Sequence, residues 1–133
     1  MEGTAFPHRF GVCIDTCHAF AAGYDLSNAE GVEGMLDEIE REVGLKNLAA
    51  FHCNDSKAPL GSGRDLHENI GEGHIGEPGF EALLSQKAVR DVPFLLEVPG
   101  YKIDGAGKGP DKPNIDRLKA IRDRVATKAS RKR

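Results

Sequence analysis

Six carboxylate and imidazole side chains occur either near the end of an apolar run or within one long polar segment. Asp15 and His18 lie three residues apart. Asp65 and His67 lie two apart, so an extended backbone turns that second pair to one side. Carboxylate oxygens and imidazole nitrogens are ligands that a borderline cation such as zinc takes. One such residue alone is more often a loop cap, but the set of six predicts a metal site: Asp15, His18, His52, Asp65, His67 and Glu97.

Three apolar runs carry members of this set at or near their carboxyl ends. They are predicted to be buried strands, Arg9–Asp15, Leu48–Asn54 and Val92–Val98. In α/β folds with parallel strands, and in (β/α) barrels above all, functional side chains gather where the strands end. The position of Asp15, His52 and Glu97 in these runs therefore indicates one shared site.

The segments between the strands predict helices. A capping box over Ser27–Glu30 opens a helix whose apolar residues recur every three or four positions as far as Val43. A short helix is predicted to start near Pro78, and a last helix is predicted to be capped by Asn114. The last helix turns four apolar residues inward, Ile115, Leu118, Ile121 and Val125. This alternation predicts an α/β fold with parallel strands.

Two polar segments, residues 55–79 and Gly105–Pro113, are predicted to be loops. A loop as long as the first is usually either functional or disordered in a compact domain. The stretch Asn54–Lys57 fits acid/base chemistry and an Asx turn equally well.

The remaining histidines, and the cysteines near the first strand, are not expected to take part in catalysis. His8 and His74 are expected in exposed loops, and Cys13, inside the first strand, is expected to be a small core residue. The spacing of Cys13, Cys17 and His18 is too loose for a structural zinc site.

The 133 residues, 39% hydrophobic and 29% charged, are typical of a single globular unit over 1–133. No run approaches the roughly 18 apolar residues of a membrane helix, and no secretory start is visible.

Three cysteines favour a reducing compartment, the cytoplasm, or the nucleus in a eukaryote. Arg117–Arg133 contains eight basic residues and one acid, and its end, residues 128–133, is predicted to be a basic flexible tail.

Three blocks, in this order, resemble the endonuclease IV family of apurinic/apyrimidinic (AP) endonucleases. They are Gly11–Asp25, His52–Lys57 and Gly61–Gly71, and Leu96–Glu97 with the last helix fits the end of that family. The resemblance covers nearly the whole chain from Phe10. It implies a TIM-barrel, (β/α)8, fold with three zinc ions that hydrolyses the phosphodiester 5′ to an abasic site in DNA.

Carried over residue by residue, the resemblance assigns Asp15, His52 and Glu97 to one zinc, through which they act in catalysis. It assigns His18, Asp65 and His67 to a second zinc, with manganese as a substitute metal. The loop around Ser62, Arg64 and Leu66 is then expected near the DNA.

The family barrel is about twice as long as this chain, which resembles its second half, about four βα units. Two histidines and a bridging glutamate that complete the family's zinc cluster have no counterpart here. Activity of this chain is therefore expected to be impaired unless a partner completes the barrel. A homodimer or a chain carrying the first half is the expected partner. A non-catalytic zinc-binding half-barrel and a metal-dependent sugar isomerase-like barrel are the alternatives; the block from Asp65 to Gly71 favours the nuclease over the isomerase.

Overall fold

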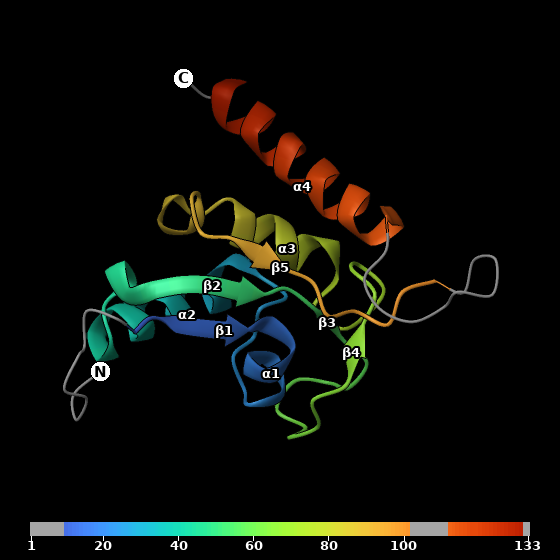
Figure 1. The fold of residues 1–133 in the computed structure, drawn as a ribbon, viewed down its shortest axis with the longest axis horizontal. Helices are drawn as coiled ribbons and strands as arrows, with labels where there is room; N and C mark the ends of the chain where they lie inside the picture. The colour runs from blue at the N-terminus through green and yellow to red at the C-terminus, as the bar shows by residue number, and fades with distance from the viewer. Residues whose placement is uncertain (1–9, 102–111, 132–133) are drawn as a thin grey trace.

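A parallel sheet forms the centre of the molecule in the computed structural model, which describes residues 10–101 and 112–131. Its strands are β1 (Val12–Asp15), β2 (Leu48–His52) and β5 (Phe94–Leu95), in the order β1–β2–β5 (Figure 1). Asp15 lies opposite His52, which lies opposite Leu95. The carboxyl ends of the three strands therefore meet at one edge, as expected for an α/β fold.

Four helices accompany the sheet within residues 10–101 and 112–131. They are α1 (Thr16–Ala21), α2 (Ala29–Glu42), α3 (Gly76–Leu84) and α4 (Lys112–Arg131), with single 3₁₀ turns η2 (Leu45–Asn47) and η3 (Lys87–Val89). Figure 1 shows α2 and α3 behind the sheet and α4 beyond α3. The core lies between the sheet and these helices, because the apolar residues of α2 and α3 are buried there against Phe51.

The two faces of the sheet differ. Ile14, Phe51 and Phe94 belong to the core or pack against it, and the rings of Phe51 and Phe94 stack with centroids 5.1 Å apart. Their neighbours Cys13 and Leu95 point to the opposite face and are exposed. The expectation that Cys13 is a core residue is therefore wrong: within the described residues, no helix covers the face on which it lies.

Several element boundaries differ from the sequence-based expectations. The cap of α2 is Asn28, whose side chain accepts a hydrogen bond from the amide of Gly31. The side chain of Ser27 is engaged instead with Asp25. The helix α1 was not predicted, and the third strand shrinks to two residues, which leaves Glu97 beyond its end. The described residues thus hold three parallel strands with their helices, compared with the four βα units expected.

The start of α4 is also different. Asn114 lies inside the helix and is buried, so it is not the cap, and Ile115 is 38% exposed rather than inward. Leu118 and Ile121 are buried as expected, and Val125 packs against the core. The helix continues to Arg131, so the first part of the predicted tail is helical. Most of the predicted loop Gly105–Pro113 lies outside the described residues, and so does His8.

The polar segment 55–79 folds around one buried carboxylate. Its strands β3 (Asp55–Ser56) and β4 (His67–Glu68) pair antiparallel. Asp55 is fully buried, and its oxygens accept hydrogen bonds from five main-chain amides, those of Ser56, Gly71, Gly73, Ile75 and Gly76. Gly73 approaches so closely that a Cβ there would lie 2.5 Å from Asp55 Oδ1. This segment is therefore an ordered frame for the residues that it carries.

Candidate metal centre

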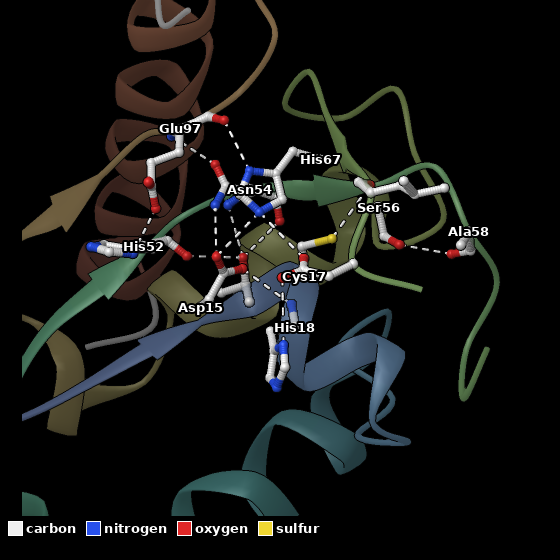
Figure 2. Close-up of polar contacts among 12 residues, drawn as sticks. Asp15, Cys17, His18, His52, Asn54, Ser56, Ala58, His67 and Glu97 are labelled. Carbon is white, nitrogen blue, oxygen red and sulfur yellow. Dashed lines mark hydrogen bonds and ion pairs between the residues drawn. The ribbon is translucent and has the colours of Figure 1, made fainter. Parts of the chain in front are cut away.

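The first group of candidate ligands lies at the carboxyl ends of all three parallel strands. Asp15 ends β1, His52 ends β2, and Glu97 follows β5 (Figure 2). His52 Nδ1 lies 2.6 Å from Glu97 Oε1, and one ligand atom from each of the three residues falls within 4.8 Å of the others. Two carboxylates and an imidazole at this spacing are a donor set that a zinc ion can take.

The second group joins the end of β1 to the strand β4. His67 Nε2 lies 3.2 Å from Asp15 Oδ2 and 3.3 Å from Asp65 Oδ1. These three residues and Cys17 again offer atoms within 4.8 Å of one another. Asp15 belongs to both groups, so the two candidate metal positions adjoin through its carboxylate.

His18 occupies a more peripheral place than its expected role as a ligand implies. Its side chain is 72% exposed, and its Nδ1 lies 3.4 Å from Asp65 Oδ2. The main-chain amide of His18 donates to Asp15 Oδ1 at 3.1 Å, which makes Asp15 the cap of α1. The structure thus brings His18 next to Asp65 but leaves it out of the compact group.

Cys17 takes the inner position that the sequence interpretation did not give it. Its buried thiol donates to the main-chain oxygen of Leu66 at 3.4 Å. Burial, followed by contact with Asp65, raises the pKa of the Cys17 thiol to about 12, so the thiol is neutral in the metal-free chain. Only the folding of the loop 57–66 brings this sulfur beside Asp65 and His67, and the local pattern carries no signal of that.

The ring of His67 is held by the main chain of Glu97. Its Nδ1 lies 2.9 Å from the Glu97 carbonyl oxygen. Burial acts to lower the pKa of His67, but this hydrogen bond and the charges of Asp15, Asp65 and Glu97 outweigh it and raise that pKa. Such a second contact on a ligand ring fixes which nitrogen faces the metal.

The expected DNA-contact residues lie on an exposed turn beside the site. Arg64 and Leu66 are exposed and Ser62 is half-buried. The amides of Gly61 and Gly63 donate to the carbonyls of Phe20 and Ala21, which attaches this turn to the end of α1. His74, as expected, is exposed in its loop. Among the described residues, no helix is long and apolar enough to cross a membrane.

The fold and the site agree with the family to which the comparisons assign this chain. The family model of the xylose isomerase-like TIM barrel matches residues 2–124, and the chain belongs to that family. It is 52% identical over 99 residues to "Probable endonuclease 4" of Methanoculleus marisnigri, a match that covers 74% of this chain and 35% of that protein. It is 51% identical over 92 residues to the protein of the same name in Thermotoga maritima, covering 69% and 32% of the two chains.

A solved structure agrees with these relatives. Endonuclease IV from Thermus thermophilus aligns with a TM-score of 0.70 and 38% identity, covering 86% of this chain and 39% of that one. The resemblance to endonuclease IV and the TIM-barrel type of fold are thereby confirmed. The chain spans about a third of the length of the curated relatives that it matches.

Proposed function

We propose that this chain carries part of the metal centre of a zinc-dependent AP endonuclease, which hydrolyses the phosphodiester 5′ to an abasic site in DNA. The observation that supports this most is the pair of ligand groups sharing Asp15 at the carboxyl ends of parallel strands. Relatives about half identical to this chain are named as endonucleases, which favours phosphodiester hydrolysis over sugar isomerisation.

The donor chemistry fits zinc. The group Asp15, His52 and Glu97 supplies three nitrogen or oxygen ligands, and Asp65 and His67, with Cys17 beside them and His18 at the edge, supply a second set. Manganese is the substitute that carboxylate-rich sites accept. When bound, zinc would supply Lewis acidity at the phosphate and activate water for attack. The chain's own carboxylates and imidazoles would hold the bound cation in place at one edge of the sheet.

DNA would approach the exposed turn beside the ligands. Arg64 offers a cation for a phosphate, Ser62 offers a hydroxyl group, and Leu66 is an exposed apolar side chain next to Asp65 and His67. The carboxylates of the site repel phosphate by themselves, so DNA binding in this proposal requires that bound cations neutralise them.

The bare face of the sheet supports a partner that completes the barrel. Cys13 and Leu95 are exposed on that face, and an apolar groove of about 840 Å³ lies between β5 and α4. We propose either a first-half barrel chain or a second copy as the occupant. The free cysteines suit a reducing compartment, so the cytoplasm, or the nucleus in a eukaryote, is the proposed location.

The deciding experiment incubates an end-labelled duplex containing one abasic site with the zinc-loaded chain, alone and with a separately produced first-half barrel protein. We expect incision 5′ to the abasic site that increases when the first half is added and disappears with a chelator. The variant Asp15→Asn is expected to lose incision in both conditions. A chain that binds zinc but never incises, even with the first half, would favour the non-catalytic half-barrel; sugar isomerisation without incision would favour the isomerase alternative.

A further inference from the structure

The side chain of Asn54 lies where the ends of the three parallel strands converge. It is fully buried, and its main chain is held by Thr16: Asn54 N donates to Thr16 Oγ1 at 2.9 Å, and that hydroxyl donates to Asn54 O at 2.6 Å. Figure 2 shows the Asn54 amide between the Asp15 carboxylate and Glu97. Asn54 therefore has little freedom to move relative to either candidate ligand.

The two ends of the Asn54 amide have distinct roles. Its Oδ1 accepts a hydrogen bond from the main-chain amide of Glu97 at 2.7 Å. Because a main-chain N–H can only donate, the atom facing it must be the oxygen, which leaves Nδ2 to donate to Asp15 Oδ2 at 3.3 Å. The orientation of the amide thus follows from its partners.

The oxygen that receives this hydrogen bond is also the one shared with the second ligand group. Asp15 Oδ2 lies 3.2 Å from His67 Nε2, while Asp15 Oδ1 accepts from the amide of His18. One carboxylate oxygen therefore caps α1 and the other is aimed at the metal groups. The hydrogen bond from Asn54 Nδ2 to Asp15 Oδ2 holds the carboxylate in this orientation.

We infer that Asn54 is the positioning residue of the metal centre, a role that rests on the proposed function. It orients the Asp15 carboxylate between the two metal positions, and it holds the main chain of Glu97 so that the Glu97 side chain reaches His52. Outer hydrogen-bond partners of metal ligands act in this way, and their loss typically lowers metal affinity about 10- to 100-fold.

A buried asparagine can also serve packing alone, so the test needs a matched control. Asn114 is 1% exposed; its Oδ1 accepts from the amide of Ile70 at 2.9 Å and its Nδ2 donates to Asn69 Oδ1 at 3.0 Å. None of these three residues belongs to the candidate ligand groups. Asn54→Leu and Asn114→Leu therefore each remove a buried amide of similar size, but only the first touches the ligands.

The experiment titrates Co²⁺ into the full 133-residue chain and its two variants, with Zn²⁺ competition and circular dichroism as the check of folding. For Asn54→Leu we expect at least about a tenfold loss of Co²⁺ affinity and a changed visible d–d spectrum. For Asn114→Leu we expect the unchanged spectrum and affinity. Equal behaviour of the two folded variants would overturn the inference, whereas a wild-type chain that binds no Co²⁺ would overturn the proposed function and the inference with it.

A second measurement covers the case in which Asn54→Leu does not fold. In ¹⁵N-labelled wild-type chain, adding Zn²⁺ should shift the side-chain amide signals of Asn54 strongly, since its partner oxygen becomes a metal ligand. The signals of Asn114 should stay nearly unchanged. Asn54 signals that do not respond to a zinc ion bound by the chain would contradict the positioning role.

Discussion

His67 Nδ1 lies 2.9 Å from the main-chain oxygen of Glu97, and this contact joins the two candidate metal groups. A carbonyl oxygen only accepts, so Nδ1 must carry the hydrogen. The opposite nitrogen, Nε2, is then the one turned toward Asp15 and Asp65. The main chain of Glu97 thereby determines which nitrogen of His67 faces the second candidate group.

The first prediction concerns this tautomer. In zinc-loaded chain labelled with ¹⁵N-histidine, Nδ1 of His67 should remain protonated while Nε2 shows the signal of a metal-bound nitrogen. The exposed His74 serves as the internal control and should show no metal-dependent signal. A zinc-loaded His67 protonated at Nε2 would contradict the arrangement.

Metal content provides the second prediction. The ligand groups of the described residues support at most about two zinc ions per chain, to be counted by elemental analysis of chelator-free protein. Asp65→Asn should lower zinc occupancy to about one, because a neutral amide binds the cation less strongly than a carboxylate does. Glu68→Gln should leave it unchanged, since Glu68 lies next to His67 on β4 and so points to the other side of the strand. Equal losses in both variants, or three tightly held ions, would contradict this prediction.

The parallel strands and the gathering of polar residues near their carboxyl ends could be predicted, because they follow from local apolar runs and from a general rule of parallel sheets. That rule brought His52 and Glu97 together although 45 positions separate them, and the structure has their side chains in contact. Helix α1 was missed because Asp15, interpreted only as a ligand, is also its cap. The mistaken cap at Asn114 has a similar cause, since its hydrogen bonds reach Asn69 and Ile70, far along the chain.

The clustering of the carboxylates and imidazoles was predictable, and the detail of their packing was less so. Alternation over residues 65–67 correctly placed Asp65 and His67 together. The inner position of Cys17 and the buried amide of Asn54 depend on how a long loop and three strand ends pack, and no spacing in the sequence encodes that. Whether these residues bind zinc stays a prediction.

The third prediction tests the buried carboxylate of Asp55. Asp55→Asn replaces one acceptor oxygen by an NH₂ group that faces main-chain N–H donors, so hydrogen bonds are lost and donors oppose each other. We expect a loss of about 3 kcal/mol in the free energy of unfolding, measured with urea. The control Asp37→Asn, on the exposed side of α2, should change it by less than about 0.5 kcal/mol. An Asp55 variant as stable as that control would refute the framing role of this carboxylate.

The fourth prediction concerns the contact between α3 and α4. Lys128 Nζ lies 2.6 Å from Glu81 Oε1, and Arg117 Nη2 lies 3.1 Å from Glu77 Oε2. These hydrogen bonds hold the pKa of both carboxyls below the usual 4.5. Their contribution to stability is therefore complete above about pH 4.5 and is lost as the pH falls through the lowered pKa values.

The double variant Glu77→Gln/Glu81→Gln should accordingly be less stable than wild type at pH 7, by less than about 1 kcal/mol because the pairs are partly exposed. The difference should vanish under acidic conditions in which both carboxyls of the wild type are protonated. Urea unfolding of both proteins across this range measures it. A difference that persists unchanged in acid would mean that packing, and not charge, joins the helices.

The last prediction is that the chain associates in solution. Within the described residues, β1 and β5 are the edge strands of the sheet, and Leu95 is 53% exposed on the face that no helix covers. Parallel barrel strands are normally covered on both faces, so a partner is expected to bury this surface. Sedimentation at micromolar concentration should find a dimer, or a complex when a first-half barrel protein is added.

Leu95→Lys should weaken either association about tenfold or more, because burying one leucine contributes about 1.5–3 kcal/mol. Leu60→Lys, at an exposed leucine on the turn beside the ligands, is the control and should leave association unchanged. A wild-type chain that stays a folded monomer in both mixtures would mean that the bare face is stable in water.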